Sequence, residues 1–509
     1  MKKNHIRFIA LILTLLMCVT VFASCKKDPA PSPTPSASSG SSSTENEPSS
    51  STSGGDPEPS ASPTGTSLES LMPVPVNLNR EMSILHGRLY YDEFLVESDD
   101  GDIVRTELFQ RKRRVEENLG VEIDLRITVG TDEEDFLKKA RNAAKNSDPA
   151  EQVDVISQYS QYSGLLTLEG IYQNIADNEH LNLNNPWWPK HLLSASSFDD
   201  KVYFVSGDIS PTLLYETYAI FFNSNLIESY GFEDPISLAS NKQWTIDKLI
   251  GMTAGIYEGL NPSETAPSAG DFFAFTLCDQ WHGKCLPFGL GMRVIEPDSE
   301  KGYIVSPKYS DEKSDSIMKK LGEWITGNDG VCVDPAGYGT SFVNGNSIFV
   351  VGNFAYPCFS FANSTVTKYG VVPIPMWDED QGEYFSYHGN PASFWSVPIG
   401  AISVDDSCRL IESLAADAYI KISPALFEIA LKYKYVPTSV DGLSHMYDII
   451  RESLVFDAVM FYRKSLSSYN EFTEIFTASA TKWNASIRFK VATMNKQIQT
   501  VVTALQKLP

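Results

Sequence analysis

The chain has 509 residues, of which 42% are hydrophobic, and a formal net charge of −23 from 64 acidic and 41 basic side chains. This acidic balance argues against nucleic acid as a ligand, because phosphate binding needs basic stripes. The one basic cluster of the folded part, 111–114, is expected to lie on the solvated face of a helix. The length beyond residue 72 suggests two or three domains.

The N-terminus has the order of a secretory signal peptide over residues 1–24. Basic residues within 2–7 precede an apolar run over 8–23, which is short for a membrane span of roughly 20 residues. The residues before Cys25 resemble a bacterial lipobox, with Phe22 where Leu is usual. This resemblance implies cleavage and acylation of the Cys25 thiol by fatty acids such as palmitate. An ordinary signal peptide with a coincidental cysteine is the alternative.

Residues 25–72 are expected to form a lipidated, disordered tether. The segment consists mainly of Ser, Pro, Gly and Thr, and it cannot bury enough apolar surface to offset the entropy lost on folding. A flexible coil of about 47 residues spans roughly 35 to 40 Å. A mucin-like or wall-threading stalk is the alternative, and both interpretations place the folded part outside the cell.

Seven cysteines occur in the chain, and five remain once Cys18 is removed with the signal and Cys25 is acylated. An odd number does not indicate a disulfide scaffold. Cys278 and Cys285 in "CDQWHGKC" could be bonded or could be free thiols. The Cys-x-x-Cys spacing of zinc sites is missing there, so no metal is expected.

Hydrophobic periodicity predicts helices that alternate with strands in the first part of the folded body. The spacing predicts a helix over 106–119 that ends at a left-handed Gly120, followed by a strand over 121–127. A second helix over 132–145 precedes a short buried strand over 153–159. This alternation favours an α/β fold with a parallel sheet.

Ligands of such sheets bind beyond the carboxyl ends of the strands, which places Tyr159 and Tyr162 at a candidate binding edge. Farther along, an apolar strand over 218–222 leads into a helix whose expected cap is Asn225 and whose end is Gly231. Another helix is expected to begin at Thr245, and the last 60 residues are expected to be mostly helical.

No catalytic motif stands out, and the protein is not expected to be an enzyme. The sequence "SIMK" (316–319) matches the Ser-x-x-Lys of penicillin-recognising enzymes, but the partner motifs are missing. The acidic stretch "DEDQGEY" (378–384) does not have the spacing of an EF-hand and favours a solvated loop. Paired carboxylates for glycoside cleavage remain open, because such residues meet only in the fold.

Several segments together resemble the extracellular solute-binding lipoproteins of ABC importers, specifically the sugar-type family 1. "KVYFVSGDIS", "YAIFFNSNLIESYGFEDP" and "QWTIDKL" are similar to the central signature of this family. "NGNSIFVVGNF" and "YGVVPIPMWDEDQGEYFSY" are similar to later family segments. The resemblance covers roughly residues 80 to 475 and is specific in the order of its motifs.

The resemblance implies an α/β, two-lobe periplasmic-binding-protein-like fold (type II). Its discontinuous lobes would be joined by crossing segments near 207–217 and 382–391. The implied N-terminal lobe comprises 73–208 and 383–432, and the implied C-terminal lobe comprises 209–382 and 433–509.

The same resemblance implies that the protein captures a carbohydrate, expected to be an oligosaccharide, in an interlobe cleft and delivers it to an ABC permease. A monomer without a cofactor, held by its lipid at the outer face of the cytoplasmic membrane of a Gram-positive cell, is expected. A surface glycan-degrading enzyme and a ligand-presenting sensory lipoprotein are the alternatives. The particular sugar stays open, as do peptides and polyols.

Sugars present an apolar face, which aromatic rings cover, and a rim of hydroxyls, which carboxylates and amides bind. For each ring, packing in the core is the alternative, and Asp208 could instead cap a turn. The expected ligand-binding residues are Tyr159, Tyr162, Asp208, Tyr215, Glu216, Phe354, Tyr356, Asn390 and Trp395.

Overall fold

The structure is a computed structural model in which residues Thr66–Pro509 form one compact unit. The predicted signal peptide, Cys25 and most of the predicted tether lie outside the described residues. No helix of the described part is long and apolar enough to cross a membrane. The structure describes residues 68–89, 93, 96, 99–129, 131–145, 152–260, 267–268, 270–277, 280–333, 339–361, 364–389, 391–434, 440–469 and 472–509.

The last residues of the predicted tether belong to the folded part. Leu68–Leu71 form a short 3-10 turn, and Leu71 and Met72 pack against the hydrophobic core below the first sheet. The tether therefore ends before residue 68, because apolar side chains reappear there and can be buried.

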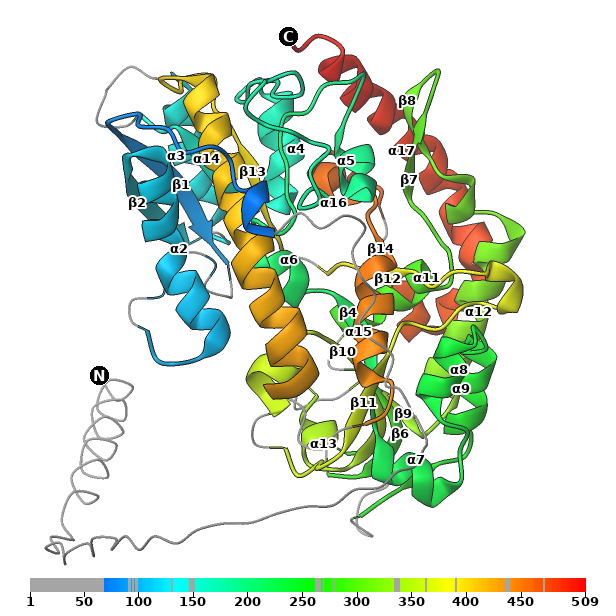
Figure 1. The fold of residues 1–509 in the computed structure, drawn as a ribbon. Coiled ribbons are helices and arrows are strands. Elements are labelled where there is room, and N and C mark those ends of the chain that lie inside the picture. The colour runs from blue at the N-terminus through cyan, green and yellow to red at the C-terminus, as the bar shows by residue number, and fades with distance from the viewer. Residues whose placement is uncertain are drawn as a thin grey trace, which may run out of the picture. The chain divides into compact units, whose positions relative to one another are not determined.

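The first sheet has four strands in the order β13-β3-β1-β2 (Figure 1). β1 is parallel to both β2 and β3, as the alternation of helices and strands predicted, whereas β13 returns antiparallel beside β3. The strands are β1 (Arg80–Arg88), β2 (Val121–Val129), β3 (Val155–Tyr159) and β13 (Ser393–Ser396).

Four helices accompany this sheet, and their ends follow the expected local signals. The predicted Gly120 ends α2 in the left-handed region at φ 59°, and Asp102 caps its start by accepting from two backbone N–H groups. The helices are α2 (Ile103–Leu119), α3 (Glu133–Lys145), α4 (Ser160–Leu168) and α14 (Val404–Asp417).

Arg111 contradicts the expectation of a solvated basic face on α2. Its side chain is fully buried, on the same face as Leu108 and Val115. Its guanidinium donates to the carbonyls of Ile209 at 2.8 Å and Leu414 at 3.0 Å. Burial lowers its pKa to about 10, so the side chain stays charged at neutral pH. Arg111 thus joins α2 to two distant segments of the chain.

The second sheet has six strands, and every residue of β4 and β10 is buried. β10 lies between β4, to which it is antiparallel, and β6, to which it is parallel. The strands are β4 (Tyr218–Asn223), β5 (Tyr257–Glu258), β6 (Phe272–Leu277), β9 (Val331–Val333), β10 (Ser347–Asn353) and β11 (Tyr369–Val372).

The helices around this sheet agree with the sequence pattern except at one cap. α7 is capped by Asn223, which accepts from the N–H groups of Asn225 and Leu226, so the predicted cap at Asn225 is wrong. Thr245 caps α9, as predicted. The helices are α7 (Ser224–Tyr230), α8 (Pro235–Ser240), α9 (Ile246–Thr253), α12 (Glu312–Gly327), α13 (Thr340–Val343), α15 (Leu443–Glu452) and α17 (Trp483–Leu505).

Short elements complete the described fold. β12 and β14 form a parallel pair, and β7 and β8 form a hairpin. These elements are α5 (Lys190–Ser196), α6 (Pro211–Tyr215), α10 (Gln280–Gly283), α11 (Cys285–Gly289), α16 (Val459–Tyr462), β7 (Ile295–Asp298), β8 (Gly302–Val305), β12 (Ser386–Tyr387) and β14 (Leu454–Val455).

Two segments of the chain run side by side between the sheets. The first crossing segment, 206–217, leads from the bridge between Val205 and β13 to the start of β4, and the second, 388–392, leads into β13. The hydroxyl of Ser206 donates to the carbonyl of Ser393 at 2.7 Å, and the N–H of Gly389 donates to the carbonyl of Glu216 at 2.7 Å. After α14 come the helical segments Ala418–Ile422 and Ala425–Lys434, which both contact α2, and the second of them also contacts α15.

Candidate functional site

The carboxyl ends of the parallel strands in both sheets meet the crossing segments. β3 ends at Tyr159, which pairs with Ser393 at the end of the second crossing segment. β10 ends at Asn353, which pairs with Tyr218 at the end of the first. Ligands of α/β sheets bind beyond this edge, so the side chains here form the candidate site.

Five side chains at this junction form what we call the edge cluster: Glu216, Tyr218, His282, Asn353 and Tyr356. The Asn353 amide donates to the Glu216 carboxylate at 3.1 Å, and both residues are buried. The His282 ring lies edge-on to Tyr218 and to Tyr356, with centroids 5.2 and 5.9 Å away. A carboxylate and an amide therefore lie next to aromatic rings.

Asn353 keeps one hydrogen-bonding atom unused. Its Oδ1 is buried and has no hydrogen-bond partner among the described residues. A buried acceptor without a partner costs free energy, on the order of 1 to 3 kcal/mol, so it is usually satisfied by water or a ligand. Oδ1 therefore lacks a donor in this arrangement of the described residues.

Gly389 holds the second crossing segment against the edge cluster. A Cβ atom at this position would lie 2.4 Å from the ring of Tyr218 and 3.0 Å from the carboxylate of Glu216. Only glycine therefore permits this close approach of backbone and side chains.

Tyr215, the residue before Glu216, forms a second aromatic pair with Phe359. Their rings meet edge to face with centroids 5.3 Å apart. Tyr215 is buried, whereas the Phe359 side chain is 55% exposed. An exposed ring beside buried polar groups is the combination that a sugar face and its hydroxyls require.

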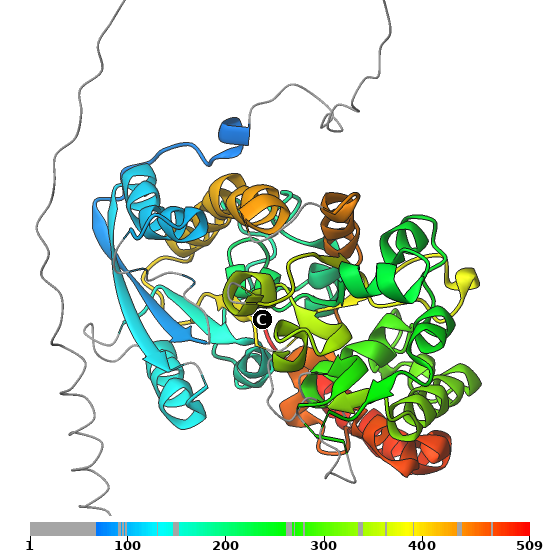
Figure 2. The same cartoon turned by 90° about the horizontal axis from the view of Figure 1, so that it is seen from below.

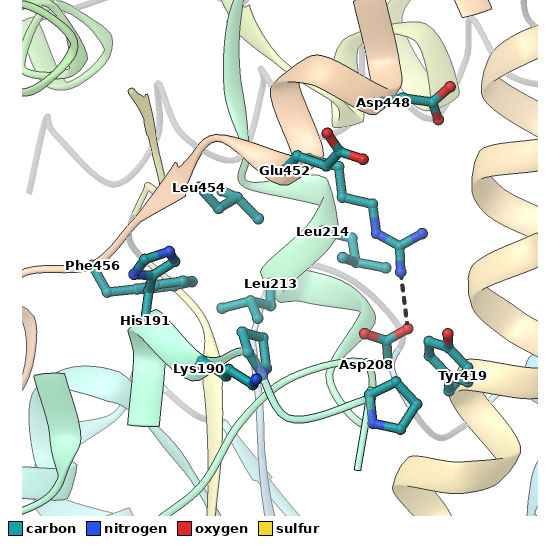
Figure 3. Close-up of a pocket in the computed structure, with 13 residues that line it drawn as sticks. Lys190, His191, Asp208, Leu213, Leu214, Tyr419, Asp448, Glu452, Leu454 and Phe456 are labelled. Atoms are coloured by element: carbon teal, nitrogen blue, oxygen red, sulfur yellow. Dashed lines mark hydrogen bonds and ion pairs between the residues drawn. The ribbon is translucent and has the colours of Figure 1, made fainter. Parts of the chain in front are cut away.

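A separate cavity of about 400 Å³, the hinge pocket, lies against other residues of the first crossing segment (Figure 3). Leu213 and Leu214 of α6 face this cavity, while the next residue, Tyr215, packs against Phe359. Its lining residues are Pro186, Pro189, Lys190, His191, Asp208, Leu213, Leu214, Tyr419, Asp448, Arg451, Glu452, Leu454 and Phe456.

Asp208 is the most buried carboxylate of the hinge pocket. It accepts a hydrogen bond from Ser423 at 2.5 Å and pairs with Arg451 at 3.3 Å. Burial raises the pKa of Asp208, although Arg451 and Ser423 act to lower it. These protein partners already engage Asp208, so a ligand would have to compete for it.

Two of the predicted site residues, Glu216 and Tyr356, belong to the edge cluster. Tyr215 packs on Phe359 outside it, and Asp208 lies in the hinge pocket. Tyr159 is half-buried at the end of β3 with its hydroxyl bonded to Gln161. Tyr162 is buried, and its ring stacks on Phe136 at 5.7 Å.

The structure places Phe354 and Trp395 in the core. Phe354 packs edge-on against Phe427 and Tyr447 and has no exposed surface. Trp395 is equally buried, and its indole N–H donates to Ser210 at 2.8 Å. In both positions the ring has the contacts of a packing residue. Asn390 lies outside the described residues.

Sequence reasoning missed Asn353, Tyr218 and His282. Asn353 had a usable signal, because it is a polar residue at the carboxyl end of an otherwise apolar strand. His282 had none, since its position beside Tyr218 depends on contacts between distant segments. In the described part of the chain, no group of three or more metal-binding side chains lies together.

Comparison with known proteins decides the fold. No protein-family model matches the chain, and neither does any curated protein. Solved structures match at very low identity but over most of the chain. The chain has the fold of the sugar-binding, solute-binding proteins of ABC importers.

One solved structure with this solute-binding fold is an ABC substrate-binding protein from Listeria monocytogenes in complex with cycloalternan. It has a TM-score of 0.52 and 11% identity, and the match covers 82% of this chain and 99% of that one. Another is a cyclo/maltodextrin-binding protein complexed with maltotetraose, with a TM-score of 0.53 and 13% identity, and coverage of 82% and 97%.

The predicted two-lobe α/β fold is confirmed by these matches. The two sheets correspond to two lobes. The residue boundaries of the lobes stay a prediction. The edge cluster lies at the carboxyl end of β10 in the second sheet, where the first crossing segment enters β4.

Proposed function

We propose that this protein captures an oligosaccharide between its two lobes and delivers it to an ABC permease. The observation that carries the proposal is the edge cluster, in which Glu216 and Asn353 lie buried beside aromatic rings at the carboxyl end of β10, next to the crossing segments that join the two sheets. The carboxylate and the amide can bind neighbouring sugar hydroxyls, while Tyr215 and Phe359 can cover an apolar sugar face.

The fold comparison supports the choice of ligand class. The two solved structures described above hold cycloalternan and maltotetraose, which are a cyclic and a linear oligosaccharide. These ligands were bound by those proteins, and they are the first sugars to test for binding to this protein. The proposed binding role without turnover is supported by the same comparison, because one of these structures is a substrate-binding protein and the other a cyclo/maltodextrin-binding protein.

Lobe closure is the proposed mechanism. A ligand that touches both lobes favours the closed arrangement only through the contacts it gains there. The crossing segments, held together by the bond from Gly389 to Glu216, end beside the cluster, so a ligand at Glu216 lies next to the moving junction. A micromolar ligand corresponds to about 8 kcal/mol, which a few stacked rings and charged hydrogen bonds can supply.

The anchoring part of the proposal rests on the sequence before residue 68. Cleavage before Cys25 and acylation of its thiol would hold a monomer at the outer face of the cytoplasmic membrane, since two or more acyl chains anchor stably. Replacement of Cys25 by Ala is expected to release the protein from the membrane fraction of the cells that make it. Retention of this variant in that fraction would contradict the anchor.

A thermal-shift screen tests the binding function. The body from residue 66, which is a compact unit, is incubated with monosaccharides, malto-oligosaccharides and cyclic glucans. An oligosaccharide ligand raises the melting temperature by mass action, and the sugar is recovered intact. Release of shorter products would indicate the glycan-degrading enzyme instead, and no shift with any sugar would refute the proposed ligand class.

A further inference from the structure

The C-terminal end of the chain has a charge opposite to that of the whole. Residues 475–509 contain five basic residues and no acidic residue, although the chain has a net charge of −23. Of these basic side chains, Lys490 lies 3.8 Å from Glu474, and the other four form no ion pair with any described residue. The basic residues are Lys482, Arg488, Lys490, Lys496 and Lys507.

α17 carries three of these five basic residues, and two of them, Arg488 and Lys496, are exposed. Its inner face is buried through Trp483, Ile487, Met494 and Ile498. Phe489 and Lys496 are exposed seven residues apart on the outer side of the helix, Arg488 is exposed beside Phe489, and Lys507 is exposed just after the helix ends at Leu505. In both views α17 lies at the outside of the compact unit, on the side away from β1 and β2 (Figures 1 and 2).

Phe489 is 81% exposed, the highest value for an aromatic side chain among the described residues. A single exposed apolar residue is ordinary on a protein surface. Phe489, however, lies between Arg488 and Lys490 on a helix without acidic residues. A basic helix face that bears an aromatic ring is typical of helices that lie in the interface of a membrane.

A shallow groove of about 540 Å³ continues this face toward the C-terminus. Lys496 and Lys507 line it together with Gln499 and the hydroxyls of Thr500 and Thr503. Lys496 and Lys507 are cationic donors that suit a phosphate group, whereas the Thr500 hydroxyl already donates to the carbonyl of Lys496 and the Gln499 amide to the carbonyl of Tyr303. From Phe489 to the end of α17 at Leu505 the face spans roughly 24 Å at 1.5 Å per residue.

We propose that the outer face of α17 docks onto the anionic phospholipid surface of the membrane that carries the anchor. Phe489 enters the boundary between headgroups and acyl chains, and the groove between Lys496 and Lys507 holds lipid phosphates. The rest of the protein is acidic and is repelled by the anionic surface. The molecule therefore docks with α17 toward the membrane and its other faces away from it. The setting rests on the proposed lipid anchor, because a tether of about 35 to 40 Å keeps the helix near the membrane.

Vesicle co-sedimentation tests this docking. The body from residue 66, which has neither acyl group nor signal peptide, is mixed with equimolar phosphatidylglycerol and phosphatidylcholine, or with phosphatidylcholine alone. We expect binding to the anionic vesicles only, and weaker binding at high salt. The double variant Arg488→Gln/Lys496→Gln loses about fivefold in partitioning per charge. Phe489→Ser loses on the order of tenfold, since the ring is partly buried in the bilayer.

Matched controls separate this face from the overall charge. Lys138→Gln/Lys242→Gln removes two exposed lysines elsewhere, and Val74→Ser removes another exposed apolar side chain. Both controls are expected to bind the vesicles as the unchanged body does. Equal binding to both kinds of vesicle, or equal losses in the helix and control variants, would overturn the proposal. Because no sugar is present, either result leaves the carbohydrate-binding proposal untouched.

Discussion

The Asp208 carboxylate and the Arg451 guanidinium form an ion pair at 3.3 Å across the hinge pocket. Asp208 belongs to the first crossing segment and Arg451 to α15, and the two are 243 residues apart. Arg451 also lies over the ring of Phe427, 4.6 Å from its centroid. The pair therefore ties the junction between the lobes to a helix of the second lobe.

Replacement of Arg451 by Met should leave a buried carboxylate without its counter-charge. Arg451 is 32% exposed, so solvent screens the pair, and we expect a loss of about 1 to 2 kcal/mol in the free energy of unfolding at neutral pH. Burial already raises the pKa of Asp208, and the variant raises it further. A raised pKa disfavours the folded state as pH increases, so the loss should shrink in acid.

Urea unfolding at mildly acidic and mildly alkaline pH measures this effect. Arg451→Lys retains the charge and should show a smaller deficit that changes little with pH. An Arg451→Met deficit that is equal at both pH values would contradict the assigned role of the ion pair.

Asp457 should be a second residue that makes the free energy of unfolding depend on pH. Its fully buried carboxylate accepts from the N–H groups of Val294, Ile295 and Val459. Burial raises its pKa from 3.8 to about 6. The stability that it contributes is fully present below about pH 4, is lost as pH rises to about 6, and amounts to about 3 kcal/mol.

The variant Asp457→Asn cannot titrate and loses this pH dependence. The asparagine amide has one acceptor oxygen where the carboxylate has two, so one of the backbone N–H bonds is lost. The variant should therefore be less stable than the unchanged protein at every pH. The stability difference from the unchanged protein is expected to be larger at pH 4 than at pH 7. Chemical denaturation across this range measures it, and a constant difference would refute the assignment.

Arg111 should be indispensable to the first lobe, whereas its neighbour Arg113 should not. The Arg111 guanidinium bonds carbonyls on separate segments, which a lysine ammonium cannot reach together. We expect Arg111→Lys to cost about 2 to 4 kcal/mol, because buried carbonyls lose their donors. Arg113 is 70% exposed, so Arg113→Lys should change stability by less than about 0.5 kcal/mol. Thermal unfolding of the two variants measures this difference. Equal melting temperatures for Arg111→Lys and Arg113→Lys would contradict the role assigned to Arg111.

The local parts of the fold were predictable because their causes are local. Gly120 and Gly231 end helices in the left-handed region, and Thr245 caps a helix, as the sequence pattern indicated. Arg111 also had a readable signal, since it lies three residues after Leu108 and four before Val115 on the buried face. Its charge led to the wrong expectation, because charged residues are rarely fully buried.

The pairing of distant segments was not predictable from the residues alone. Glu216 and Asn353 are 137 residues apart in the sequence, and no local pattern near either residue predicts their hydrogen bond. The presence of an aromatic residue also did not predict whether its ring lies at the surface or in the core. Tyr215 contacts the exposed Phe359, whereas Trp395 is fully buried. The two-lobe arrangement was predicted from the resemblance to solute-binding proteins, because local sequence patterns do not predict how distant segments assemble.

The most direct test of the central claim is calorimetric titration of two matched variants with the oligosaccharide found in the screen. Glu216→Gln alters the edge cluster, and Glu452→Gln makes the same change in the hinge pocket. We predict that Glu216→Gln raises the Kd by about 10- to 100-fold, the value of one charged hydrogen bond, and that Glu452→Gln leaves it unchanged. Unchanged affinity in Glu216→Gln together with lost affinity in Glu452→Gln would contradict the account and move the ligand to the hinge pocket.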